Sequence, residues 1–365
     1  MNTVVQRILF APASGPAGSG EYFRCLCLAQ AMKRRLPGLD VHFLLHREAR
    51  LEHDPDLTYH ELQATPSLAG NEATETIRRL RPALGVFDCS GRVRHLAEVR
   101  ATGGRTAWIS NRPSQRQRGF RPRRLRVLDL HLIMDSGNPM PRLGPLEKLL
   151  LAVFPRTRVE FINLIAPEPA SIESSARLAR LADCDYAVFA AGGGGWSHDN
   201  RPVPEILVDA AVRFHRASGM QAVVVMGPQY RGAVRRHDEV EIIGQVTPAQ
   251  LAGILSGARL AVVGAGNMLS AQALTAATPC VMTAVGGSDQ PHRVADYSRR
   301  GLVVGSRLEA GTLADSALQL LRQPDLARQL VEAAQSGGFR NDRELAVDCL
   351  VDLLAETGDQ PLPPS

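Results

Sequence analysis

The stretch that decides the fold spans residues 260–297 and reads LAVVGAGNMLSAQALTAATPCVMTAVGGSDQPHRVADY. Its first four residues are apolar and predict a buried parallel strand. A Gly-Ala-Gly turn at 264–266 follows, and then a helical pattern that Pro279 ends. Residues 280–285 predict the next strand. The stretch is therefore one strand–turn–helix–strand unit of an α/β fold.

The glycine turn in this unit predicts a site for a phosphate or pyrophosphate group. Gly264 and Gly266 let main-chain N–H groups approach a ligand, and the helix start at Asn267 and Met268 adds about half a positive charge. Polar residues beyond the second strand lie where open α/β sheets bind ligands. They are Asp289, Gln290 and His292. Together these features predict the donor half of a sugar-nucleotide site.

The composition describes a globular protein of more than one domain. The chain has 365 residues, of which 44% are hydrophobic and 22% charged, and this length is large for a single core. No apolar run nears the roughly 18–20 residues of a membrane span, and the first residues lack a signal-peptide pattern. The six cysteines show neither metal nor disulfide spacing. We therefore expect a cytoplasmic protein with reduced thiols.

Predicted strands and helices alternate twice along the chain. The first series covers 4–134, the second begins at Tyr186, and the join lies between 161 and 183. Alternating elements predict parallel sheets with right-handed crossovers. We expect an α/β protein with two Rossmann-like domains, 1–165 and 166–365, which face one another across a ligand-binding cleft.

A second glycine-rich turn follows the first strand of the second series. It consists of Gly192, Gly193, Gly194 and Gly195. Four glycines pack poorly and cost backbone entropy in a regular element. Close approach of the main chain to a phosphate or sugar is therefore the favoured interpretation.

Two acids of the first domain are candidates for a general base. Glu21 starts a helix after a loop of small residues at 12–20. It either stabilises the helix dipole or, once buried, takes a proton from an acceptor hydroxyl. Asp88, at the end of a predicted strand, is the rival base, or it caps the turn at Ser90 and Gly91.

One cluster of positive charge is unusual. Eight arginines and no acid lie between Arg105 and Arg126. The cluster is either a solvated loop in an arginine-rich protein or a contact for an anionic acceptor or membrane surface, through Arg116 to Arg126. Nucleic acid is disfavoured, because the cluster holds only two aromatic residues.

Several stretches, taken in order, resemble glycosyltransferases of the GT-B fold. The likeness is to the branch with the N-acetylglucosaminyltransferase of peptidoglycan precursor synthesis (glycosyltransferase family 28) and the UDP-sugar hydrolase of pseudaminic acid synthesis. It spans about the whole chain. The stretches that carry it are 18–29 (GSGEYFRCLCLA), 109–111 (ISN), 192–195 (GGGG), 264–279 and 288–292.

On the acceptor side, the resemblance implies a functional role for Asn111. The first loop of the relatives ends in Gly-His, where the His is a catalytic candidate, and here Glu21 stands at that point. The other acceptor-side candidates are Gly18, Gly20 and Arg112.

On the donor side, the resemblance implies that the backbone at Val246 contacts the base and that residues 288–292 contact the sugar. Gln272 stands where the transferases have a ribose-binding Glu. A glutamine can still hydrogen-bond a ribose hydroxyl, although it lacks the charge.

The sequence thus predicts an inverting, metal-independent glycosyltransferase that moves a sugar from a nucleotide diphosphate, in particular UDP, to an acceptor hydroxyl or amine. The acceptor is a small molecule or a lipid-linked sugar. Two alternatives stay open: a nucleotide-sugar hydrolase or epimerase of the same fold, and a non-catalytic nucleotide-sugar binding protein. We expect no cofactor, no metal and no nucleic acid, and a cytoplasmic location with peripheral contact at the inner membrane face.

Overall fold

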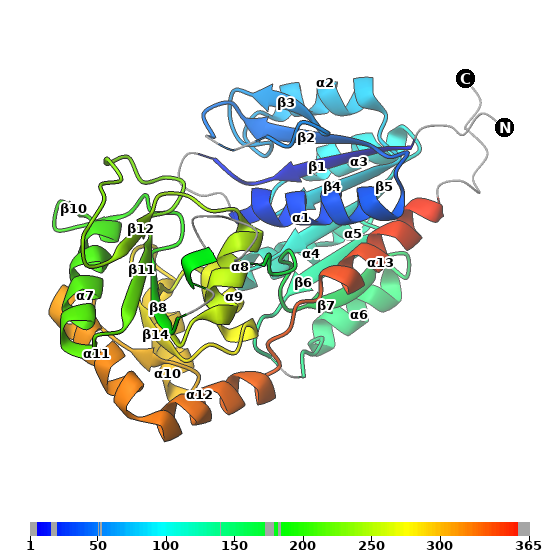
Figure 1. The fold of residues 1–365 in the computed structure, drawn as a ribbon. Coiled ribbons are helices and arrows are strands. Elements are labelled where there is room, and N and C mark those ends of the chain that lie inside the picture. Colours follow the sequence, from blue (N-terminus) through cyan, green and yellow to red (C-terminus); the bar gives the residue numbers. More distant parts are fainter. Residues whose placement is uncertain are drawn as a thin grey trace. The chain divides into compact units, whose positions relative to one another are not determined.

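The computed structural model describes residues 6–15, 20–49, 51, 53–138, 140–171, 179–181 and 184–356. Within these ranges the chain forms two compact units, each built on a parallel β-sheet with helices between its strands (Figure 1). Unit 1 comprises residues up to 136, 140–165 and those from 341 onward, and unit 2 comprises 137–139 and 166–340. The predicted two-domain α/β class is confirmed.

The sheet of unit 1 has seven strands in the order β3-β2-β1-β4-β5-β6-β7, all parallel. They are β1 (Arg7–Pro12), β2 (Asp40–His46), β3 (Thr58–Leu62), β4 (Leu84–Asp88), β5 (Arg105–Ser110), β6 (Leu130–Met134) and β7 (Arg158–Ile162). Ile8, Leu9 and Phe10 are all fully buried, as expected for a strand with both faces covered. After β1, the chain adds β2 and β3 on one side of it and then β4 to β7 on the other side. The pair β1 and β4 is therefore the topological switch point.

Seven helices belong to unit 1 within the described residues. They are α1 (Gly20–Arg35), α2 (Gly70–Leu80), α3 (Val93–Ala101), α4 (Pro113–Gly119), α5 (Pro122–Leu125), α6 (Pro145–Val153) and α13 (Arg343–Ala355). The sequence patterns did not predict α4, α5 and α6. In the parts of the chain that the structure describes, no helix has both the length and the apolarity to cross a bilayer.

The larger sheet of unit 2 has six strands in the order β12-β11-β8-β13-β14-β15. They are β8 (Tyr186–Ala190), β11 (Gln221–Val225), β12 (Glu241–Ile243), β13 (Leu260–Gly264), β14 (Cys280–Thr283) and β15 (Val304–Gly305). Numbered along the chain, this order is 3-2-1-4-5-6, that of a dinucleotide-binding sheet. Its switch point is therefore the pair β8 and β13.

The remaining elements of unit 2 lie before, between and after these strands in the chain. The helices are α7 (Val203–Ser218), α8 (Pro248–Gly257), α9 (Asn267–Thr275), α10 (Gln290–Arg299), α11 (Ala310–Arg322) and α12 (Pro324–Ser336), with a short 3₁₀ helix, η2, at Ala179–Leu181. A small hairpin of β9 (Ser197–His198) and β10 (Arg201–Pro202) follows the glycine run.

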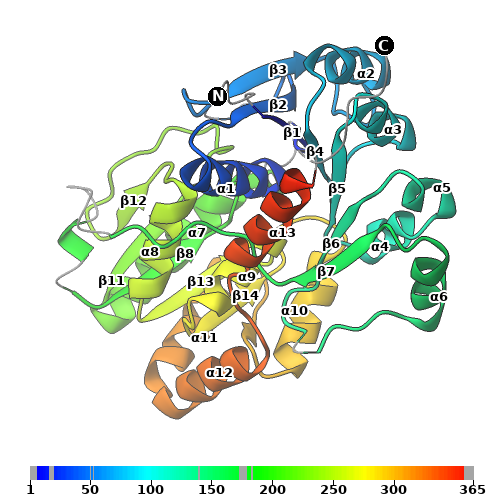
Figure 2. The same ribbon diagram turned by 90° about the vertical axis from the view of Figure 1, so that its right-hand side faces the viewer.

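The last helix, α13, returns to unit 1 and lies beside α1 (Figure 2). Leu350 and Leu353 of α13 belong to the same apolar cluster as Leu28 and Met32 of α1. Arg35 adds ion pairs to two acids of α13 at the surface. The described residues 341–356 therefore group with unit 1, although the predicted second domain extended to 365, because the apolar face of α13 packs on the core that α1 also covers.

We expect Leu350→Ala to lower the free energy of unfolding of unit 1 by about 2–5 kcal/mol, because it removes a fully buried leucine. Leu345→Ala on the same helix is the control, since Leu345 is 37% exposed, and should cost less than about 1 kcal/mol. Of the two tryptophans, Trp108 is buried in unit 1, so Trp196→Phe leaves a single fluorescent reporter there. The measurement is denaturant unfolding followed by Trp108 fluorescence. An unchanged transition midpoint in Leu350→Ala would contradict the assignment of α13 to the core of unit 1.

Candidate functional site

The two glycine turns of unit 2 meet at one point of its sheet. β8 and β13 are neighbours, with Ala190 opposite Val263. Gly192 comes two residues after β8 and Gly264 ends β13, so both turns lie at the carboxyl edge of the switch point. This is the place where open α/β sheets bind nucleotides. The sequence identified both turns, and the strand order brings them together.

The turn after β13 is tightly packed at its first glycine and open at its second. A Cβ on Gly264 would lie 2.9 Å from the carbonyl oxygen of Ala191 and 3.0 Å from Val285. A Cβ on Gly266 would have nothing within 4 Å. Gly266 directly precedes α9, whose first N–H groups have no acceptor within the helix. The open side of this turn therefore presents main-chain donors.

The turn after β8 is held against the turn after β11. Gly192 and Gly194 have φ of +86° and +79°, the left-handed region that favours glycine. A Cβ on Gly194 would overlap the carbonyl oxygen of Met226, and the N–H of Gln229 donates to the carbonyl oxygen of Gly193 at 2.7 Å. Main-chain packing thus explains part of the glycine run, whereas Gly192 has only an ordinary contact, 3.7 Å, at its Cβ position.

Trp196 directly follows the glycine run and was not predicted as a site residue. It is 45% exposed, and its ring lies against Gly286, where a Cβ would overlap it. Gly286 belongs to the loop after β14, so the ring joins two loops at the carboxyl edge. Gly195, beside it, is exposed and lies close to the side-chain oxygen of Gln229. A half-exposed indole at this edge can stack on a planar ring.

Arg293 of α10 is a second residue that the sequence patterns missed. Its Nη1 donates to the carbonyl oxygen of Ala265 at 2.6 Å, and its Nη2 donates to Asp289 Oδ2 at 2.7 Å. Ala265 is the middle residue of the glycine turn. The guanidinium therefore lies at the turn that was predicted to bind a phosphate or pyrophosphate group, and its charge there is shared with the Asp289 carboxylate. The sequence patterns did not predict α10, so they gave no indication that Arg293 lies at the glycine turn.

The predicted sugar-contacting residues have different surroundings. Gln290 is buried, and its Oε1 accepts hydrogen bonds from the N–H of Val285 at 2.8 Å and of Gly286 at 3.3 Å. It shapes the loop from within. The side chains of Asp289 and His292 are exposed next to Gln290, so a ligand that binds at this edge of the sheet could contact them.

The other donor-side residues lie along the same edge. Asn267 and Met268 are half-buried in the first turn of α9, and Gln272 is buried one turn further on. Val246 is half-buried in the loop between β12 and α8. Each of these elements begins or ends at the carboxyl edge of a parallel strand, which is why residues so far apart in sequence share one edge.

The switch point of unit 1 is closed by an ion pair. Arg24 of α1 donates through Nε and Nη2 to the two carboxylate oxygens of Asp88, both at 2.6 Å, and both side chains are buried. Burial lowers the pKa of Arg24, but the charge and hydrogen bonds of Asp88 outweigh it and raise the pKa above its ordinary value. Both oxygens of Asp88 are thus engaged, which favours a structural role for this residue over proton transfer.

Glu21 lies in the first turn of α1, half-buried, and Gly20 before it has open space at its Cβ position. Gly18 lies outside the described residues. Asn111 follows β5, and its Oδ1 is buried with no hydrogen-bond partner in the described part of the chain. Arg112 is exposed at the start of α4. Of the predicted site residues of unit 1 that the structure describes, Glu21 is therefore a partly exposed acid and Asn111 has an unpaired amide oxygen.

The arginine cluster divides into paired and exposed members. Arg116 forms two hydrogen bonds with Glu147, at 2.8 and 2.6 Å. Arg124 is buried over the ring of Trp108 and donates to the carbonyl oxygen of Gly91, and burial lowers its pKa to about 10. The exposed members are Arg112, Arg118, Arg121, Arg123 and Arg126.

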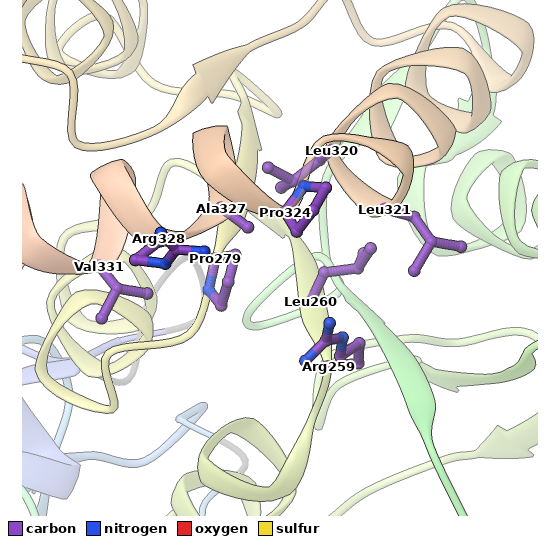
Figure 3. Close-up of a pocket in the computed structure, with 9 residues that line it drawn as sticks. All are labelled: Arg259, Leu260, Pro279, Leu320, Leu321, Pro324, Ala327, Arg328 and Val331. Atoms are coloured by element: carbon purple, nitrogen blue, oxygen red, sulfur yellow. The ribbon is translucent and has the colours of Figure 1, made fainter.

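A cavity of about 350 Å³ lies elsewhere in unit 2. Figure 3 shows that most of the side chains that line it are apolar and that Arg259 and Arg328 are also among them. Arg259 and Pro279 directly precede β13 and β14. Because the strands are parallel, this cavity lies at the edge opposite the glycine turns and is separate from the predicted site.

We expect Gly194→Ala to destabilise unit 2 by at least about 2 kcal/mol, because the added methyl group meets the Met226 carbonyl and φ is positive. Gly266→Ala is the matched change in open space and should cost less than about 1 kcal/mol. Denaturant unfolding followed by circular dichroism measures both. Equal losses in the two variants would show that the contact at Met226 does not hold the turn.

No family model matches the chain, and no curated protein does. Solved structures match it over nearly its full length. UGT2 of Phytolacca americana, complexed with UDP-2-fluoro-glucose and pterostilbene, has a TM-score of 0.64 and 14% identity, with 97% of this chain and 100% of that chain covered. MurG of Acinetobacter baumannii has 0.57 and 14%, with 95% and 99% covered.

A putative UDP-N-acetylglucosamine 2-epimerase of Listeria monocytogenes has a TM-score of 0.59 and 12% identity, with 100% of this chain and 99% of that chain covered. At such identities a likeness establishes architecture and leaves chemistry open. The chain therefore has the two-domain GT-B fold that these transferases share with the epimerase.

Proposed function

We propose that this chain is a glycosyltransferase whose unit 2 binds a nucleoside diphosphate sugar, in particular a UDP-sugar. The observation that carries the proposal is the meeting of two glycine turns at the β8/β13 switch point, with the guanidinium of Arg293 on the second turn. A diphosphate needs hydrogen-bond donors and positive charge, which the open start of α9 and Arg293 supply together.

The rest of the donor follows from the same edge. Trp196 offers a face on which the base or sugar ring can stack. Asp289 and His292 are proposed to contact sugar hydroxyls, and Gln272 and Val246 the ribose and the base. Gln290 supports this loop from its buried position.

In the proposed reaction, an oxygen or nitrogen of the acceptor attacks the anomeric carbon while the bond from that carbon to the diphosphate breaks. One displacement inverts the configuration at this carbon. The proton leaves the acceptor for Glu21 of unit 1, which is preferred to Asp88 because Arg24 occupies both oxygens of Asp88. Arg293 and main-chain donors stabilise the departing diphosphate, so we propose catalysis without a metal or other cofactor.

The acceptor is proposed to be a small molecule or a lipid-linked sugar, bound on the side of unit 1. The Oδ1 of Asn111, which is buried without a hydrogen-bond partner in the described part of the chain, is proposed to receive a hydrogen bond from it. The exposed arginines from Arg112 to Arg126 are proposed to meet negative charge, either of an acceptor or of a membrane surface.

We expect Arg293→Ala to weaken UDP binding at least about tenfold, since a charge-assisted hydrogen bond contributes about 1.5–3 kcal/mol. Arg299→Ala is the control on the same helix, because Arg299 is exposed and its ion pair among the described residues is with Asp296. Isothermal titration with UDP measures both, and quenching of Trp196 emission gives an independent signal. Unchanged UDP affinity in Arg293→Ala, with the fold intact, would remove the diphosphate from this turn.

We expect Glu21→Gln to lower turnover about 100-fold or more while UDP affinity stays unchanged, because only proton transfer is lost. Glu48→Gln, at an exposed position of unit 1, is the control. Asp88→Asn should instead lower stability by about 3–5 kcal/mol, since it leaves Arg24 buried without its counter-charge. Full turnover of Glu21→Gln with a donor and acceptor pair would exclude Glu21 as the base.

The structural likeness to a putative 2-epimerase supports a second candidate activity. In a nucleotide-sugar hydrolase or epimerase, water replaces the acceptor or the sugar is rearranged without transfer. Incubation of the protein with a labelled UDP-sugar alone separates these reactions: free sugar indicates hydrolysis, a changed sugar epimerisation, and neither indicates that an acceptor is required. UDP-sugar binding with no turnover on a broad acceptor panel would indicate a binding protein.

A further inference from the structure

The cavity of about 350 Å³ in unit 2 has an apolar lining that belongs to two helices and two strand starts. Helices α11 and α12 supply six of the nine lining residues, and the segments that begin β13 and β14 supply the other three (Figure 3). Leu260 and Leu320 are buried, and Pro279, Leu321, Ala327 and Val331 are half-buried. Small-molecule sites have volumes of about 300–1,000 Å³, so this cavity can hold a small organic ligand.

Two cations accompany this lining, and none of the nine described residues around the cavity is an acid. Arg259 is exposed and has no ion pair in the described part of the chain. Its main-chain N–H donates to the carbonyl oxygen of Tyr186 at 2.8 Å, which fixes its backbone at the edge of the sheet. The guanidinium of Arg259 is therefore held near the cavity without a counter-charge from the lining.

Arg328, the second cation, has a partner that it can exchange. It pairs with Asp325 on the same helix at 3.2 Å, and the two side chains are 67% and 81% exposed. An exposed ion pair of this kind is weak, because water screens it and two mobile side chains must be held in one geometry. A ligand anion can therefore replace Asp325 as the partner of Arg328.

An apolar cavity with two arginines is complementary to a molecule that has an apolar body and one anionic group. The apolar body is removed from water against the lining, and a guanidinium binds a carboxylate through two parallel hydrogen bonds. Asp325 already neutralises part of the positive charge. A singly charged carboxylate therefore matches the cavity better than a phosphate monoester, whose charge is about −1.5 to −2.

We propose that this cavity is a second ligand site of unit 2, which binds a small amphipathic carboxylate. Its apolar tail would contact Leu260 and Leu320, and its carboxylate would pair with Arg259 and Arg328. Leu260 is the first residue of β13 and Gly264 is the last, so the cavity and the glycine turn lie at opposite ends of one strand. The carboxylate and a nucleotide can thus bind together, and the proposal does not rest on the proposed transferase function.

The test is a titration of the full chain with octanoate, followed by saturation-transfer NMR of the octanoate protons. We expect octanoate to saturate one site, and octan-1-ol, which has the same tail without the charge, to bind at least about tenfold more weakly. Arg259→Ala with Arg328→Ala should weaken octanoate binding at least about tenfold and leave octanol binding unchanged. Both arginines are exposed, so folding should be unaffected.

Ala327→Phe tests the cavity itself, because the larger side chain fills it and should weaken octanoate and octanol alike. The matched control for the charge is Arg213→Ala with Arg216→Ala on α7. Both of these arginines are exposed, and Arg216 pairs with Glu239 as Arg328 pairs with Asp325. The control should bind octanoate as the original chain does.

Three results would overturn the proposal. Unchanged octanoate binding in the variant that lacks Arg259 and Arg328 would place the probe elsewhere. Octanol or octyl phosphate binding as tightly as octanoate would remove the preference for a carboxylate. Displacement of octanoate by UDP would place the probe at the glycine turns, whereas a chain that binds octanoate but not UDP would leave this proposal standing and contradict the sugar-nucleotide site.

Discussion

The close approach of main chain to main chain at the β8/β13 switch point is the constraint on which the proposed site depends. Gly264 brings its backbone against Ala191, and Gly194 brings its backbone against Met226. Any side chain at either position would separate the turns that follow β8, β11 and β13. Because these contacts use no side chains, the amides at the start of α9 and the guanidinium of Arg293 can lie at one open edge. A diphosphate fits such an edge by charge and by hydrogen bonding.

Unit 1 meets the same topological situation with the opposite chemistry. Its strand order also changes side between two central strands, β1 and β4, but there Arg24 and Asp88 occupy the switch point as a buried ion pair. A buried pair is costly to desolvate and costlier to break, so it specifies how α1 meets β4. With the switch point of unit 1 closed in this way, we place the proposed nucleotide site in unit 2. Among the predicted site residues of unit 1, Glu21 is partly exposed and the Oδ1 of Asn111 has no hydrogen-bond partner in the described part of the chain.

The sequence was informative about the proposed site wherever the relevant residues are neighbours in the chain. A glycine after an apolar run shows itself in the order of residues, and both turns were identified in this way. Arg293 and Trp196 escaped, because their relevance arises from contacts with Ala265 and Gly286, which the chain brings close only in three dimensions. Gln290 has a polar side chain typical of a ligand contact, yet it turns inward to the loop's own amides.

The features of the fold also separate into those that local sequence determines and those that tertiary packing determines. Hydrophobic periodicity by itself determined the alternation of strands and helices and hence the two-domain α/β class, because each strand and helix buries a face whose period is written in neighbouring residues. Tertiary structure alone decided the order of strands, the packing of α13 on the apolar cluster that α1 also covers, and the exposure of Leu146 and Leu149 on α6. These features depend on which apolar surfaces remain uncovered after the sheets form, and that is a property of the packed chain and not of any local stretch.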